Sequence, residues 1–435
     1  MRKTSKSEKE VENVAAYVGI DWADNAHEVR MLIVETSQVE TMKLKQEPES
    51  LREWVERLRE RFNGRKVAIV VEQRKGALIY ALMSYEFLIL YPVNPATLAR
   101  IREAFNVGGT KTDPTDAELL LDLIRLHRNK LRAWVPDDAD TRLLQMLVEE
   151  RRRLVDEVTR ETNRLKSTLK QYYPQALEWA GELNEEMALD FLTRWPTLGS
   201  IRRAGSNAIE KFYRDHRVRS EEKLERRLKS IKEARELTSD QAVLIGSKTK
   251  ALVIVQLLRV LKKSIGRINK QIDELFEKHP DHQIFSSFPC AKKVLAPRLL
   301  AAFGSDRTRY ESASEIQSFS GIAPVTKRSG KSKSVNKRLA CPKFLRQSFH
   351  EYAGQSIKQG GWARSYYREL RQRGMKHHAA VRSLAYKWIR IMYRCWQNQE
   401  PYDETKYIAS LKRRGSPLTA ALSDAGRLQG CGLDC

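Results

Sequence analysis

The chain has 435 residues, of which 41% are hydrophobic, so it can bury a large core and is expected to form about two or three domains. Lys and Arg number 79 against 55 Asp and Glu, which gives a formal net charge of +24. A positive excess of this size indicates a polyanionic partner, with nucleic acid as the first candidate.

The composition argues against several other classes of protein. No uncharged apolar run is long enough to span a membrane, since even the segment 77–93 is interrupted by Glu86. The first ten residues, MRKTSKSEKE, lack the apolar core of a secretory signal, so we expect a cytoplasmic protein. The five cysteines are scattered and include no C-x-x-C pair, which argues against a disulfide framework or a structural zinc site.

Residues 15–130 alternate between strand and helix patterns, which predicts a mixed α/β sheet with flanking helices. Strands are expected over residues 17–21, 28–35, 66–72 and 88–93 and near Met42. Helices are expected over residues 49–62 and from Gly76, Pro95 and Asp113. We therefore expect the first domain to end near residue 130.

Four acids lie where these elements begin or end. Asp21 and Glu72 close two strands, and the segment KTDPTDAELLLDL places Asp113 and Asp116 at the start of a helix. Taken alone, D-P-T-D is a good helix start, with Asp113 as N-cap and Pro114 as the first helical residue. Four carboxylates on converging ends of one α/β unit also suit a pair of Mg²⁺ or Mn²⁺ ions that polarise a phosphodiester.

The order of these acids resembles a known family. The segments GID, VE and KTDPTDA are similar to the RuvC-like, ribonuclease H-type DEDD domain of the insertion sequence 110 transposases, relatives of the Piv DNA invertases. The resemblance implies that Asp21, Glu72, Asp113 and Asp116 are catalytic residues that bind divalent metal. It also implies a bacterial or archaeal protein that acts on nucleoid DNA.

Residues 140–280 are expected to form two long helices. The second has an unbroken heptad pattern, typical of a coiled coil, that comprises Ile254, Leu258, Leu261, Ile265, Ile268, Ile272 and Leu275. The two helices could pack on each other within one chain or pair between chains in a homodimer or homotetramer. Between them, residues 181–250 are dense in charges of both signs, which predicts a solvated helix without chemistry.

A basic stretch marks the C-terminal third, residues 281–400. Between Lys327 and Lys343 there are seven Lys or Arg and no acid, with Ser and Gly interleaved, as suits a loop that lies along a phosphate backbone. The segment is not a P-loop, because Val325 stands where the first glycine of that motif belongs. The residues expected to bind nucleic acid are Lys327, Arg328, Gly330, Lys331, Lys333, Lys337 and Arg338.

The same stretch extends the resemblance. The run FSGIAPVTKRSG is similar to the signature of the family's C-terminal transposase domain, which implies that Ser329 is the nucleophile that attacks DNA. Relatives usually carry P-G-I-G in a helix-hairpin-helix that grips phosphate, and this chain has Pro289-Cys290-Ala291-Lys292 instead. The resemblance also implies a structured bridge RNA that guides the protein to donor and target DNA.

The predicted architecture is thus an α/β RuvC-like domain (15–130), long coiled-coil helices (140–280), a mostly helical transposase domain (281–400) and a flexible tail (401–435). The predicted function is a transposase or site-specific recombinase. Two alternatives stay open: a RuvC-like endonuclease that uses water, and a non-catalytic nucleic-acid-binding protein. Ser329→Ala would leave DNA cutting intact in the first alternative, and Asp113→Asn would leave every activity intact in the second.

Overall fold

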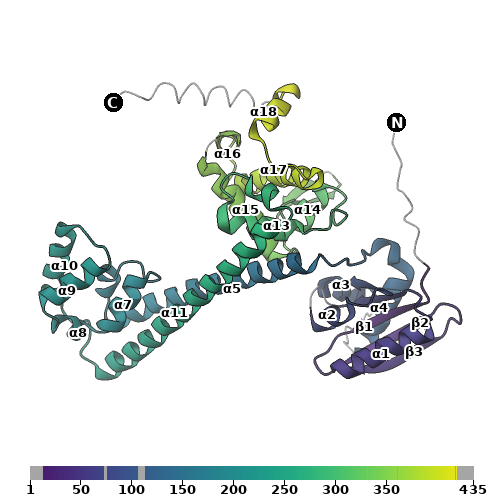
Figure 1. The fold of residues 1–435 in the computed structure, drawn as a ribbon, viewed down its shortest axis with the longest axis horizontal. Coiled ribbons are helices and arrows are strands. Elements are labelled where there is room, and N and C mark those ends of the chain that lie inside the picture. The colour runs from purple at the N-terminus through teal and green to yellow at the C-terminus, as the bar shows by residue number, and fades with distance from the viewer. Residues whose placement is uncertain are drawn as a thin grey trace. The chain divides into compact units, whose positions relative to one another are not determined.

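The computed structural model describes residues 13–72, 76–105, 113–330, 332–359, 361–416 and 418. The chain folds into two compact units, Met1–Pro136 and Asp137–Cys435. Figure 1 shows the elements of each unit. Over the described residues, none of the helices has the length and apolar character needed to cross a membrane.

The first unit is built on a sheet of five strands in the order β3-β2-β1-β4-β5. Its strands are β1 (Ala16–Asp21), β2 (Ala26–Ile33), β3 (Val39–Lys45), β4 (Val67–Val71) and β5 (Leu88–Pro92). β1 pairs antiparallel with β2 and parallel with β4, and β4 pairs parallel with β5. The predicted mixed sheet is confirmed.

Helices cover both faces of this sheet. The bulky residues Val67, Ile69 and Val71 of β4 share one hydrophobic cluster with α1 (Pro48–Arg61) and α2 (Ala77–Leu82). The intervening Ala68 and Val70 belong to a second cluster with α3 (Pro95–Phe105) and α4 (Asp113–His127). Because side chains alternate along a strand, this fully apolar strand can serve both faces at once. The short helix η1 (Arg128–Lys130) follows α4.

Two long helices, α5 (Ala139–Tyr172) and α11 (Gln241–Lys278), form the axis of the second unit. They lie side by side, with the short helices that connect them in the sequence at one end and the C-terminal helices at the other (Figure 1). Ile254, Leu258 and Ile272 of the predicted heptad pattern are buried. The two helices thus pack on each other within one chain, and pairing between chains remains a prediction.

The charged segment between the long helices is a small helical subdomain, which corrects the expectation of one solvated helix. Its helices are α6 (Ala176–Trp179), α7 (Glu186–Arg194), α8 (Leu198–Arg202), α9 (Ser206–Asp215) and α10 (Glu221–Glu233). Phe212 and Tyr213 of α9 and Leu224 and Ile231 of α10 are buried in a core shared with α5 and α11. These few apolar positions are difficult to recognise in the sequence because charged residues surround them. They recur at helical spacing and suffice to hold each helix in place.

The remaining helices enclose an aromatic core. They are α12 (His282–Ser286), α13 (Lys292–Phe303), α14 (Ala313–Phe319), α15 (Lys343–Gln359), α16 (Gly361–Gln372), α17 (His377–Asn398) and α18 (Glu404–Arg413). Tyr402 and Tyr407 pack against this core, and Trp362 donates a hydrogen bond to the Tyr402 hydroxyl at 2.9 Å. These two aromatic side chains connect α18 and the segment before it to the core, and the flexible tail over residues 401–435 remains a prediction. Residues 417 and 419–435 lie outside the described part of the chain.

The basic stretch is a β-hairpin rather than the expected loop. β6 (Val325–Ser329) pairs antiparallel with β7 (Ser332–Asn336) as a two-stranded sheet. Gly330 has φ of 54° at the turn, a conformation that two-residue hairpin turns require and glycine adopts readily. The sequence alternation is weak because the described side chains of β6 and β7 are mostly exposed.

Candidate metal site in the first unit

The strand register brings two of the predicted acids together. β1 and β4 run parallel, and Ile20 pairs with Val71. Asp21 is the last residue of β1 and Glu72 directly follows the end of β4, so both lie at the same edge of the sheet. Asp21 is buried, with 8% of its surface exposed, and Glu72 is half-buried.

Helix α4 supplies a third acid. Its buried residues Asp116, Ala117, Leu120, Leu121 and Ile124 form one helical face. Gly19 of β1 lets this face approach closely, because a Cβ there would lie 2.5 Å from the Ala117 carbonyl oxygen and 2.6 Å from the Leu121 nitrogen. The close approach of α4 to β1 places Asp116, which is 0% exposed, at the sheet edge beside Asp21.

Asp21, Glu72 and Asp116 form one carboxylate cluster. One oxygen from each lies within 4.8 Å of those of the other two. Within the described ranges, this is the one group of three or more His, Cys, Asp or Glu residues so arranged. Asp113 starts α4, but its side chain lies outside what the structure describes. Three hard oxygen donors at this spacing fit a divalent cation such as Mg²⁺ or Mn²⁺.

Arg102 of α3 pairs with Asp116, the fully buried member of this cluster. Its Nε donates to Asp116 Oδ1 at 2.7 Å, and its Nη2 donates to Asp116 Oδ2 at 2.5 Å. This is a bidentate pair in which the arginine side chain is 17% exposed and the aspartate side chain is fully buried. Such pairs fix the orientation of a carboxylate as well as its charge.

The predicted serine and basic residues belong to the second unit. Ser329 is the last residue of β6, is exposed, and pairs with Ser332 across the hairpin. Lys327, Arg328 and Lys337 are exposed, whereas Arg338 is half-buried. Lys331 and the side chain of Lys333 lie outside the described part of the chain. The hairpin thus presents Ser329 among exposed cations.

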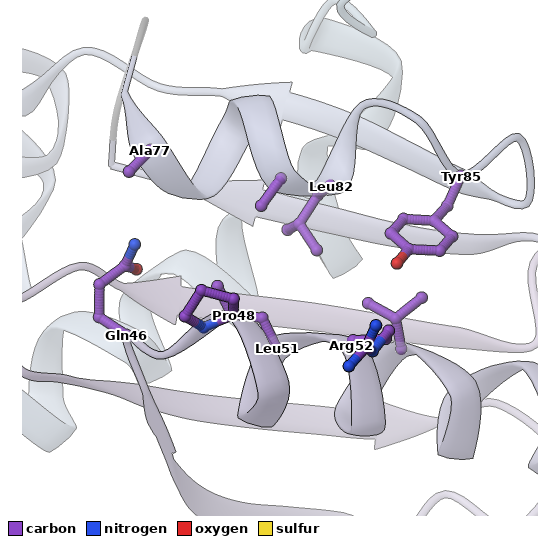
Figure 2. Close-up of a pocket in the computed structure, with 9 residues that line it drawn as sticks. Gln46, Pro48, Leu51, Arg52, Ala77, Leu82 and Tyr85 are labelled. Carbon is purple, nitrogen blue, oxygen red and sulfur yellow. The ribbon is translucent and has the colours of Figure 1, made fainter.

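The first unit also contains an apolar hollow of about 340 Å³ between α1 and α2. Figure 2 shows Leu51 and Leu82 beside Arg52 and Tyr85 in this hollow. None of the described residues that line it is acidic, so it lacks the oxygen donors that phosphoryl chemistry with metal requires. The carboxylate cluster is the better candidate for a catalytic site.

Sequence reasoning missed two residues that shape the cluster, Arg102 and Gly19. Arg102 lies four residues after the buried Leu98 and therefore on the inward face of α3, which was the available signal. A glycine in the middle of an apolar strand, as in YVGID, often marks close approach of another backbone. Neither signal identifies the residue or backbone that is contacted, because that depends on how α3 and α4 pack.

Comparison with known proteins agrees with this fold and site. A family model described as a transposase, of the DEDD type of insertion sequence 110, matches residues 18–174. A second model, described as the transposase IS116/IS110/IS902 family, matches residues 282–368. The first unit is therefore a RuvC-like DEDD domain, and the class of protein is a transposase, an enzyme that cuts DNA.

Relatives extend the likeness along most of the chain. A candidate transposase of the IS117 mini-circle from Streptomyces coelicolor is 26% identical over 410 residues, which cover 92% of this chain and 98% of the relative. The 43.6 kDa protein of insertion element IS110 from the same organism is 26% identical over 88% of this chain and 94% of its own length. The chain belongs to the insertion sequence 110 family of transposases.

Proposed function

We propose that this transposase cuts and rejoins DNA strands with divalent metal at Asp21, Glu72, Asp113 and Asp116. The observation that carries the proposal is the cluster of Asp21, Glu72 and Asp116, whose ligand oxygens lie within 4.8 Å of one another. Asp113 joins them because it stands three residues before Asp116 in the D-P-T-D segment. DNA is the substrate, which the net charge of +24 suits.

The carboxylates would hold the cation, and the buried Asp116 and Asp21 would keep it from solvent. When bound, Mg²⁺ or Mn²⁺ polarises the scissile phosphate and stabilises charge on the attacking and leaving oxygens. The protein's part is to fix the ligands before DNA arrives, since preorganised ligands need no rearrangement during the reaction. The rigid elements β1, β4 and α4 serve that purpose.

We further propose that Ser329 is the nucleophile. Its hydroxyl oxygen attacks the phosphorus, a serine phosphodiester forms, and the bond to the departing sugar oxygen breaks, with the serine proton passing to that oxygen. The hydroxyl of the exchanged strand then attacks the same phosphorus, the bond from phosphorus to the serine oxygen breaks, and the proton of that hydroxyl passes to the serine oxygen. The ester conserves the energy of the broken bond, so strands can be rejoined without ATP. The exposed position of Ser329 beside Lys327 and Arg328 supports this role.

Guidance by a bridge RNA and action as a homodimer or homotetramer complete the proposal. The excess of positive charge can accommodate an RNA as well as two DNA partners. A recombinase that joins two DNA partners needs at least two active sites, which favours an oligomer.

The metal site is tested by comparing Asp116→Asn with Asp122→Asn in cleavage of labelled DNA that carries the element junction. Asp122 lies on the same helix, and its side chain is half-exposed in an ion pair with Arg125. We expect Asp116→Asn and chelation by EDTA each to reduce cleavage by about 10²-fold or more, while Asp122→Asn cuts like wild type. Equal cleavage by Asp116→Asn and wild type in Mg²⁺ would contradict the proposal.

A further inference from the structure

Arg102 engages both oxygens of a carboxylate that the proposed metal site needs. Nε and Nη2 reach Asp116 Oδ1 and Oδ2 at 2.7 and 2.5 Å. One of these two oxygens is also the atom that lies within 4.8 Å of oxygens from Asp21 and Glu72. The arginine and a cation at the cluster therefore compete for the same acceptor.

In the metal-free protein, Arg102 offsets part of the negative charge of the carboxylate cluster. Three carboxylates this close repel one another, and burial of Asp116 strengthens that repulsion. The positively charged guanidinium of Arg102 offsets one of the three negative charges. A divalent cation brings a larger positive charge to the same place, after which the arginine charge opposes binding.

We propose that Arg102 is a positioning residue of the metal site, which acts as counter-ion to Asp116 before the cation binds and gives up at least one carboxylate oxygen when it binds. The inference rests on the proposed metal site. The arginine side chain is 17% exposed and so reaches solvent, whereas Asp116 is held on the buried face of α4. Metal binding is thus coupled to a rearrangement of the Arg102 side chain on α3.

The test measures thermal unfolding and Mn²⁺ affinity of the full chain for wild type, Arg102→Met, Arg102→Lys and Arg100→Met. Arg100 is an exposed residue of the same helix and serves as the matched control. Methionine keeps much of the arginine's apolar stem but cannot donate hydrogen bonds, and lysine keeps the charge without the planar fork. Neither measurement depends on DNA or on catalysis.

Without metal, we expect Arg102→Met to unfold at a lower temperature than wild type, because Asp116 loses two charge-assisted hydrogen bonds. Saturating Mn²⁺ should remove most of that difference, and Arg102→Met should bind Mn²⁺ on the order of tenfold more tightly than wild type. The unfolding temperature and Mn²⁺ affinity of Arg102→Lys should lie between those of wild type and Arg102→Met. Arg100→Met should match wild type in both.

Two results would overturn the inference in different ways. If Arg102→Met binds Mn²⁺ more weakly than wild type and stays less stable in Mn²⁺, the arginine remains on Asp116 in the metal complex and only orients it. If Mn²⁺ stabilises neither wild type nor any variant, the proposed metal site itself is wrong, and the role of Arg102 fails with it.

Discussion

Cys290, before α13, and Lys292, the first residue of α13, have positive φ values of 62° and 43°, in the left-handed region. The resemblance described above implies glycine at these two positions, in the P-G-I-G segment. Each side chain in this region of φ costs roughly 1–2 kcal/mol, so the segment carries local strain.

Restoring a glycine should relieve that strain. We expect Lys292→Gly to raise the free energy of unfolding by about 1 kcal/mol, because Lys292 is exposed and glycine adopts this φ without a clash. Lys293→Gly is the control and should lower it by about 1 kcal/mol, since that residue is an ordinary helical one. Denaturant unfolding measures both, and equal destabilisation by the two changes would refute the strain.

In the carboxylate cluster, the residues that could be predicted were those whose position follows from local sequence. Asp21 and Glu72 were predictable because parallel strands end at the same edge, and Asp116 because a proline starts its helix. Arg102 was not, because its partner is fourteen residues away and is set by how α3 packs on α4. Ser329 was identified by resemblance alone, and its role remains a proposal.

At the scale of elements, the contact between α4 and β1 decides where Asp116 lies. We expect Gly19→Ala to destabilise the first unit by about 1–3 kcal/mol and to weaken Mn²⁺ binding, because the new Cβ would meet the α4 backbone. Gly266→Ala is the control: nothing lies within 4 Å of its Cβ, and alanine should stabilise α11 by about 1 kcal/mol. Thermal unfolding with and without Mn²⁺ distinguishes them, and unchanged Mn²⁺ binding by Gly19→Ala would contradict this role.

His216 directly follows α9 in the helical subdomain and is its C-cap. Its Nδ1 lies 2.9 Å from the Phe212 carbonyl oxygen, and its Nε2 lies 3.0 Å from Asp190 Oδ2. Burial lowers the pKa of His216, but the Phe212 carbonyl and the Asp190 carboxylate raise it more, so the net pKa lies above its usual 6.5. Because the folded-state pKa is raised, the stabilisation is full below about pH 6.5 and is lost as pH rises through the folded value.

His216→Gln should therefore be less stable than wild type at pH 6, by at most about 1 kcal/mol for a partly exposed pair. The difference should shrink as pH rises above 6.5. Guanidinium unfolding followed by far-UV circular dichroism at pH 6 to 9 measures it, and a difference independent of pH would contradict the ion pair.

Elements were predictable where periodicity was strong. β2 alternates between buried and half-buried residues, β1 and β4 are short apolar runs, and the helix α11 has an unbroken heptad repeat of 3.5 residues. The helices α7 to α10 were not resolved, because each contributes only two to four buried residues among many charges. The hairpin of β6 and β7 was read as a loop, because its exposed strands lack an apolar face.

At the scale of the whole molecule, the proposed chemistry draws on both units. The carboxylate cluster lies in Met1–Pro136 and Ser329 in Asp137–Cys435. Family membership and the acidic cluster support metal-dependent DNA cutting, whereas the serine ester distinguishes recombination from cleavage by water. The central claim therefore depends on whether DNA becomes covalently attached at Ser329.

The most direct measurement is a test for a covalent adduct between the protein and DNA. Purified protein is incubated with Mg²⁺, labelled junction and target DNA, and RNA transcribed from the element's flanks, and the products are separated on denaturing gels. Ser332→Ala is the matched control, because Ser332 pairs with Ser329 in the hairpin. Wild type and Ser332→Ala should form a protease-sensitive DNA adduct that Ser329→Ala does not form. Nicking by Ser329→Ala at the wild-type rate, with no adduct from wild type, would contradict the claim and leave water as the nucleophile.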